Sequence, residues 1–332
     1  MISIFLERTV PAKLNALERV VRRLHHNHPQ FDTVKQALYN TQSGHGGEQY
    51  IDSALASLHF PIPHLIFPNF RLKANYIPST QIDILLLTSS YALVIEVKNW
   101  SGTITFQNTG QAIQEKNGFL RSMDCPIVQA EYYKENLLEW FFMNDIPLPV
   151  HRVVFFPYAS TLLIGADNRG IHFSKELPQI IRNLNKLPAQ LQLHQFEALS
   201  IKLQAANQPF ANENICQHYG IQPTELMKGL YCSNCHNQLF KKNSRYYACT
   251  TCFTNPNNPI QEAMIDWFTL FGNHVTNKDI RTLTGIEDSH KVQYLMKKTN
   301  FPSSGLNKGT VYHVNEEEKN KYLSKIQKAT RD

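Results

Sequence analysis

Asp83 and the triplet Glu96-Val97-Lys98 are separated by twelve residues and lie inside two strongly apolar stretches. In a β-strand successive side chains alternate between faces, so Glu96 and Lys98 share one face while Val97 points to the other. An acid and a lysine among Leu, Val and Ile cost free energy unless they pair or bind something. We therefore expect a structural ion pair or a binding site here.

If Asp83 lies on the neighbouring strand of a hairpin, its carboxylate joins that of Glu96, and the two acids can form a metal site. Two carboxylates and the carbonyl oxygen of Val97 suit Mg²⁺ or Mn²⁺, because such an ion takes few direct carboxylates and bridges to phosphate. The ion would activate water for attack at phosphorus, and Lys98 would position that water or neutralise the developing charge. The pattern thus predicts phosphodiester hydrolysis, with a plain Glu96–Lys98 ion pair at an exposed strand end as the alternative.

The segment before this pattern is expected to hold two helices. Apolar residues recur at helical spacing over residues 10–27, with arginines elsewhere on the wheel, which predicts an amphipathic helix. The run Gly44-His-Gly-Gly47 predicts a break in the chain before helical spacing resumes. Glu48 is therefore expected in the first turn of a second helix, and residues 1–43 are expected to form a helical N-terminal extension.

The strand pattern around Asp83 and Glu96 predicts a sheet covered by helices. Three successive strands, two of them joined by a hairpin through residues 88–90, are expected to form one sheet, to which a buried strand over residues 151–156 returns parallel. This order of elements is an α/β pattern, and we place the end of the domain near residue 210. Strands are expected at 65–67, 81–87, 91–97 and 103–106, and helices at 127–142, 176–184 and 193–205.

Four motifs in this region resemble the nuclease-related domain (NERD) family, a branch of the PD-(D/E)xK restriction-endonuclease-like superfamily. They are Gly46-Gly47-Glu48, Gln81-Ile-Asp83, Glu96-Val-Lys98-Asn-Trp-x-Gly102 and Pro126-x-x-Gln129. The resemblance covers about residues 44–160 and implies a restriction-endonuclease-like mixed sheet flanked by helices for the domain at 44–210. It also implies that Asp83 and Glu96 ligate metal and that Lys98 is catalytic, with Glu48 adding a carboxylate and Gln129 reaching the site from the later helix. We expect Trp100 to pack under a helix rather than to stack on a base.

Four of the six cysteines form the set C-x2-C-x13-C-x2-C, which predicts a zinc ribbon over residues 225–256. Each pair sits on a tight turn that aims two thiolates at one point, and two such turns complete a tetrahedral site with no position left for substrate. We expect a structural Zn²⁺; iron and disulfides remain alternatives. Cys216 and His218 are left out of the site. The ligands are Cys232, Cys235, Cys249 and Cys252.

The basic residues of the chain are concentrated after Met227. Residues 1–225 carry 18 Lys and Arg against 18 Asp and Glu, whereas the remainder carries 15 against 9. Such an excess favours a polyanionic partner, although a solvated surface is the simpler alternative. On the ribbon, Lys241, Lys242, Arg245 and Tyr247 are expected to bind nucleic acid through phosphates and bases.

Residues 259–332 are expected to form a helix-turn-helix or winged-helix-like region. The segment 277–286 resembles the first half of a helix-turn-helix, and residues 289–298 would form its recognition helix, with Lys291, Lys297 and Lys298 available to DNA. A small hairpin is expected to follow over residues 305–314. A plain three-helix packing domain is the alternative.

The composition excludes a mainly disordered chain, because 42% of the 332 residues are hydrophobic and 18% are charged. No apolar stretch reaches the ~18 residues of a membrane span, and the N-terminus lacks the layout of a signal peptide, so a soluble cytoplasmic protein is expected. We predict a metal-dependent nuclease acting on DNA, or on RNA. The alternatives are a catalytically silent nucleic-acid-binding adaptor and a zinc-dependent interaction protein. The oligomeric state is left open.

Overall fold

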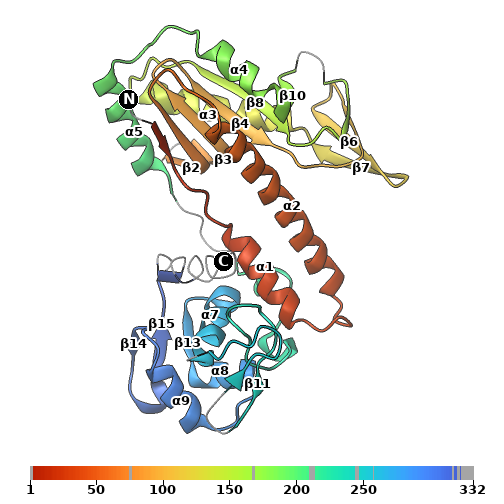
Figure 1. Cartoon of the computed structure of the whole chain (residues 1–332), viewed down its shortest axis with the longest axis vertical. Helices are drawn as coiled ribbons and strands as arrows, with labels where there is room; N and C mark the ends of the chain where they lie inside the picture. The colour runs from red at the N-terminus through yellow and green to blue at the C-terminus, as the bar shows by residue number, and fades with distance from the viewer. Residues whose placement is uncertain are drawn as a thin grey trace. The chain divides into compact units, whose positions relative to one another are not determined.

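The protein divides into two compact units in its computed structural model (Figure 1). Unit 1 comprises residues 1–8 and 43–210, and unit 2 comprises residues 9–42 and 211–332. Each unit thus combines an N-terminal segment with a later one. The structure describes residues 3–74, 77–166, 169–208, 214–243, 247–256, 258–315, 318–319 and 322.

Unit 1 is built on a six-stranded mixed sheet of order β1-β2-β3-β4-β8-β10. The pairs β2–β3 and β3–β4 are antiparallel, whereas β1–β2, β4–β8 and β8–β10 are parallel. The expected parallel return of the strand after the long helix is therefore confirmed. The strands are β1 (Ser3–Phe5), β2 (His64–Ala74), β3 (Ile77–Thr88), β4 (Ala92–Val97), β8 (Val150–Phe156) and β10 (Ile171–Phe173).

Helices cover both faces of this sheet, as the sequence predicts. Helices α3 (Pro126–Met143) and α5 (Leu193–Ala206) pack on one face, where the alternate β4 residues Ala92 and Val94 lie. On the other face, α2 (Phe31–Ala56) and α4 (Leu177–Leu184) pack against Leu93, Ile95 and Val97. A 3-10 turn at Ser174–Glu176 leads into α4. Burial on both faces explains the near-continuous apolar run of β4.

A second sheet of order β7-β6-β5-β9 was not expected from the sequence. The strand expected at residues 103–106 is present, but it joins this second sheet and not the main one. Gly102, with φ +87°, turns the chain out of the main sheet, and a Cβ there would lie 2.3 Å from the Glu115 carbonyl oxygen. The strands are β5 (Thr103–Phe106), β6 (Gln111–Lys116), β7 (Phe119–Asp124) and β9 (Leu162–Ile164).

The predicted break at residues 44–47 is also wrong, because α2 runs through these glycines without interruption. Glu48 therefore lies in the second half of a long helix, not in a first turn. At Gly47 an added Cβ would lie 2.8 Å from Cβ of Asn99, so the missing side chain lets α2 approach the segment after β4. Asn99 Nδ2 donates a 2.9 Å hydrogen bond to the Ser43 carbonyl oxygen at this contact. Gly47 therefore serves packing rather than chain reversal.

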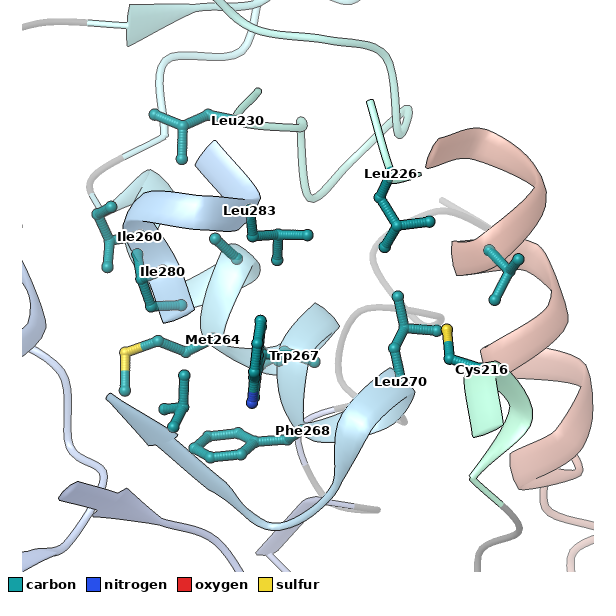
Figure 2. Packing of buried hydrophobic residues seen from close by; sticks show 14 of the residues in the cluster. Cys216, Leu226, Leu230, Ile260, Met264, Trp267, Phe268, Leu270, Ile280 and Leu283 are labelled. Carbon is teal, nitrogen blue, oxygen red and sulfur yellow. The ribbon is translucent and has the colours of Figure 1, made fainter. Parts of the chain in front are cut away.

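Unit 2 follows the order helix, strand, helix, helix, strand, strand after its ribbon, as a winged helix does. Its core lies around α7, and Figure 2 shows Met264 and Phe268 of this helix packed together with Ile280 and Leu283 of α8. The strands β14, β15 and β13 form one small antiparallel sheet. The elements are α6 (Ile215–His218), a 3-10 turn (Pro223–Glu225), α7 (Pro259–Phe271), β13 (His274–Thr276), α8 (Asn277–Thr284), α9 (Ser289–Lys297), β14 (Ser303–Ser304), a 3-10 turn (Asn307–Gly309) and β15 (Val311–His313).

Helix α1 (Ala12–Arg23) belongs to the core of unit 2 and is not a simple amphipathic helix. Its arginines were expected away from the apolar side, yet Arg19 and Arg23 are buried. Both form ion pairs with Asp266 of α7, whose carboxylate is fully buried. Together with Arg22, these arginines hold the pKa of Asp266 far below its usual range, although burial of the carboxylate alone would raise it. Within the described residues, no helix is long and apolar enough to cross a membrane.

Candidate functional site

Lys98 lies at the end of β4 and forms an ion pair with Glu96, with 2.5 Å between Nζ and Oε1. Its ammonium group also donates a 3.0 Å hydrogen bond to Oε1 of Gln129, in the first turns of α3. Gln129 in turn donates to the Tyr133 hydroxyl at 2.7 Å. The predicted neighbours Glu96, Lys98 and Gln129 therefore meet on the α3 side of the sheet, with Val97 on the opposite face.

Asp83 lies on β3, beside the end of β4, as the hairpin pattern predicts. Its Oδ2 accepts a 2.8 Å hydrogen bond from the backbone N–H of Val97. The last ladder pair on this side is Ile84 with Ile95, so this hydrogen bond joins the two strands beyond the regular ladder. The carboxylate thus fixes the strand end that carries Glu96 and Lys98.

Glu48 reaches the same place from α2, although its predicted position in the helix was wrong. Its carboxylate forms an ion pair with the Arg8 guanidinium, whose side chain is only 3% exposed. Arg8 also contacts Asp52, with 2.5 Å between Nε and Oδ2, and donates to Asn69 Oδ1 at 2.8 Å. A further 2.9 Å hydrogen bond runs from Nη2 to the Asp83 carbonyl oxygen.

Sequence reasoning missed Arg8, Asp52 and Tyr133. The only available signal was spacing: Asp52 follows Glu48 by four residues, and Tyr133 follows Gln129 by four, so each pair shares a helix face. For Arg8 there was no signal, because its contacts join segments far apart in the chain.

Burial, together with repulsion between neighbouring charges, raises the pKa values of the three acids Glu48, Asp83 and Glu96. Desolvation, reinforced by the Asp83 charge, raises the pKa of both Glu48 and Glu96 to about 8. Desolvation also raises the pKa of Asp83. Burial alone would lower the pKa of Lys98, but the charges of Glu96 and Asp83 outweigh it and the pKa is raised. The lysine is therefore a cation at neutral pH, and it faces carboxylates whose pKa values are raised chiefly by desolvation.

The donor set is compatible with a divalent cation. Oε2 of Glu96 is buried and has no hydrogen-bond partner among the described residues, which leaves a buried oxygen in need of a positive group. Asp83 and Glu96 supply hard oxygen donors, as does the backbone carbonyl of Val97 at the strand end. A cation there would relieve the repulsion that raises the carboxylate pKa values.

Trp100 packs rather than standing open for a base, as expected. It lies against the cluster that contains Phe156, with ring centroids 6.1 Å apart, and its carbonyl oxygen accepts a 2.5 Å hydrogen bond from Thr161 Oγ1. Lys98 Nζ lies 5.8 Å from the Trp100 ring centroid. The ring therefore forms one wall beside the lysine.

A second site lies in unit 2, where the four predicted cysteines meet with all four sulfur atoms within 4.8 Å of one another. None of them is in a disulfide. Sγ of Cys232 lies 3.6 Å from that of Cys252, and Cys235 lies 3.2 Å from Cys249. These separations are close to the edge of a tetrahedral zinc–thiolate centre, about 3.8 Å for bonds of ~2.3 Å.

Local geometry explains how both cysteine pairs face one point. Each pair is followed by a residue in the left-handed region, His236 with φ 60° and Phe253 with φ 59°, so each turn closes tightly. The predicted ribbon hairpin is present as β11 (Phe240–Lys241) paired antiparallel with β12 (Tyr247–Ala248). Cys216 lies in the apolar core of unit 2, apart from the four-sulfur group.

The residues expected to bind nucleic acid are spread over the ribbon and α9. Lys241, Lys242, Lys297 and Lys298 are exposed. Lys291 is only partly exposed, because its Nζ lies over the Tyr247 ring at 5.3 Å from the centroid. Arg245 lies outside the described residues.

Comparison with known proteins agrees with this geometry. Residues 43–157 match the family model of the nuclease-related domain, NERD. This stretch contains Glu48, Asp83, Glu96, Lys98 and Gln129, and it confirms the resemblance drawn from the motifs. The chain therefore carries a nuclease-related domain of mixed α/β fold beside a four-cysteine cluster of zinc-ribbon type. Searches of curated proteins and of solved structures found no match.

Proposed function

We propose that the protein is a divalent-metal-dependent nuclease that hydrolyses DNA phosphodiester bonds, with Mg²⁺ or Mn²⁺ at the carboxylate site. The observation that carries this proposal is the contact between Lys98 and Glu96, beside Asp83 and at the end of a buried strand. A structural ion pair would not require two further acids, Asp83 and Glu48, whose charges add to desolvation in raising the pKa of Glu96. Clusters of this kind are typical of active sites.

Asp83, Glu96 and the carbonyl oxygen of Val97 would hold the cation. When bound, such an ion supplies Lewis-acid stabilisation of phosphate charge and a more acidic water. Lys98, kept cationic by its two carboxylate neighbours, donates hydrogen bonds to the non-bridging phosphate oxygens as negative charge develops on them. It cannot act as a base while protonated. Gln129 and Tyr133 orient the ammonium group.

In the reaction water adds to phosphorus, the bond to the leaving oxygen breaks, and that oxygen takes up a proton. The chain's own contribution is to hold the phosphate beside the ammonium group of Lys98 and to keep the carboxylates fixed through Val97 and Arg8. Preorganised charge of this kind needs no rearrangement during the reaction.

The ribbon and the winged-helix-like region would bind the nucleic acid. The exposed Lys241, Lys242, Lys297 and Lys298 support phosphate contacts, and the excess of basic residues after Met227 supports a polyanionic partner. A structural Zn²⁺ would hold the ribbon together. RNA as substrate is an outcome of the test below.

The test is a cleavage assay on single-stranded, double-stranded and branched DNA and on RNA, with Mg²⁺ or Mn²⁺. Lys98→Ala and Asp83→Ala should each lower cleavage by about 10²-fold or more while binding is retained. Lys134→Ala is the control, because Lys134 forms a partly exposed ion pair with Glu131 on the same helix as Gln129. Salt-sensitive binding without any cleavage would replace the nuclease proposal with a catalytically silent adaptor.

A further inference from the structure

In the hairpin formed by β6 and β7, five of the six residues of β7 are exposed. Its strands pair over six residues each and turn through Asn117 and Gly118, which have φ 53° and 79°. Figure 1 shows the paired strands extending to a tip away from the main sheet. At that tip Phe119 is 79% exposed and Leu120 is 73% exposed. Two large apolar side chains are therefore exposed to solvent at this tip.

The pairing register sorts the hairpin's charges onto opposite faces. Residues directly opposite each other share a face, and faces alternate along each strand. One face carries Lys116 opposite Phe119, and Gln114 opposite Arg121. The other carries Glu115 opposite Leu120, and Gln111 opposite Asp124. Among residues 111–124, both cations therefore lie on the first face and both acids on the second.

The cationic face continues the core-facing side of the small sheet. Ala112, two residues before Gln114, is fully buried and belongs to the cluster that contains Phe156 and Ala130 of α3. Residues Ile104 and Phe106 of β5, paired with Gln114 and Ala112, face the same cluster. The first face thus looks toward the α3 side of the molecule.

The candidate active site lies on the same side. Lys98 meets Gln129 of α3, and Ala130 is the next residue of that helix. Gln114 Nε2 donates a 2.8 Å hydrogen bond to the carbonyl oxygen of Ser101, three residues after Lys98. A strand of nucleic acid whose phosphate lies at Lys98 therefore has the cationic hairpin face as its neighbour.

We propose that this face of the hairpin, defined by Lys116, Phe119 and Arg121, binds a nucleic-acid strand next to the phosphate under attack. Lys116 and Arg121 contact backbone phosphates, and Phe119 stacks on an unpaired base or at a base step. The inference rests on the proposed function and deepens it, because it assigns substrate contacts to unit 1 itself. The opposite face, with its two acids, is left toward solvent.

Variants matched across the two faces test the assignment. In the full chain, with EDTA present to prevent cleavage, binding of a fluorescent single-stranded oligonucleotide is measured over a range of salt concentrations. The double variant Lys116→Ala/Arg121→Ala should reduce the slope of log affinity against log salt by about 1.4, the loss of two phosphate contacts on a single strand. Phe119→Ala should weaken binding about tenfold.

The controls are Leu120→Ala and the double variant Glu115→Gln/Asp124→Asn, which change equally exposed positions on the acidic face. Neither should weaken binding. With Mg²⁺ restored, Phe119→Ala should raise KM for cleavage and leave kcat within about twofold. Circular dichroism verifies that every variant is folded.

Two outcomes overturn the inference, and they are distinguishable. If the unaltered protein cleaves and binds nucleic acid but the two faces give equal effects, the hairpin assignment alone fails. If the unaltered protein neither binds nor cleaves, the proposed function fails and the inference fails with it. An equal loss on both faces, accompanied by a change of oligomeric state, would mean that the edge of β7 pairs with a second copy of the chain.

Discussion

Arg8 Nη2 donates a hydrogen bond to the carbonyl oxygen of Asp83, so a residue outside the matched stretch 43–157 fixes the strand that carries a candidate metal ligand. The same guanidinium pairs with Glu48 and Asp52 of α2. One side chain therefore ties β3 to α2 and neutralises part of the acidic cluster.

Replacing Arg8 is expected to destabilise unit 1. Arg8→Met leaves Glu48 and Asp52 without their partner in a buried place, and removal of one member of a buried ion pair costs about 3–5 kcal/mol. Arg8→Lys should restore little of this, since an ammonium group cannot reproduce the forked contacts of a guanidinium. Thermal unfolding provides the measurement. Within the part of the chain that the structure describes, the Arg182 side chain on α4 hydrogen-bonds only to Gln179 of its own helix, so Arg182→Met should unfold like the unaltered protein.

The stability of the metal-free protein should fall as pH rises from about 5 to about 8. The pKa of Glu96 is about 8 in the fold and 4.5 ordinarily, so within this window the folded state holds a proton that the unfolded state has lost. The stabilisation from that proton is complete below pH 4.5 and is lost as pH passes 8. Glu96→Gln should show a flatter profile in thermal melts with EDTA.

Added Mg²⁺ should oppose this loss most strongly above pH 8, because the cation takes the place of protons on the carboxylates. Calorimetric titrations in two buffers of different ionisation enthalpy should detect proton release near neutral pH. A metal effect that is the same at pH 6 and pH 8.5 would contradict the raised pKa values.

The glycines of α2 should respond oppositely to alanine. Gly47→Ala places a Cβ 2.8 Å from Cβ of Asn99 and 3.2 Å from Pro157, so α2 must move and about 1–3 kcal/mol is lost. Gly44 and Gly46 have no atom within 4 Å of an added Cβ, and alanine at either should stabilise the helix by up to about 1 kcal/mol. Thermal melts of the three variants provide the comparison, and equal effects would contradict the close approach.

Removal of zinc should unfold part of unit 2. Cys232 and Cys249 are buried in the same apolar cluster as α7 and α8, so loss of the metal leaves that core incomplete. Metal analysis should give one zinc per chain, and Cys249→Ser should lose it. Cys125→Ser, in unit 1, should retain zinc. Retention of zinc by Cys249→Ser would contradict the four-thiolate site.

Local patterns predicted most of the elements that position the site. The alternation around Glu96-Val97-Lys98 placed the acid and the lysine on one face, and the structure has them there. Helix α8 begins at the first residue of the segment 277–286, which was compared with a helix-turn-helix, because Thr276 caps it, and Gly285 ends it in the left-handed region. Hydrophobic periodicity and capping residues are local signals, and they are readable from one chain.

The errors come from contacts between distant segments. Gly44, Gly46 and Gly47 have low helix propensity, and packing of α2 outweighs it. Residues 103–106 have a strand pattern that does not say which sheet they join. Arg19 and Arg23 resemble solvated residues until Asp266, more than 240 positions later, is brought against them.

The two-segment make-up of each unit determines how the protein can be divided for experiments. A fragment of residues 43–210 lacks Arg8 and would leave Glu48 and Asp52 without their ion-pair partner. A fragment of residues 211–332 lacks α1, so the buried Asp266 would lose its arginines. Inactivity or insolubility of either piece would reflect a missing partner rather than the properties of the intact chain. Expression of the C-terminal modules should therefore supply residues 9–42 as a linked or co-expressed segment.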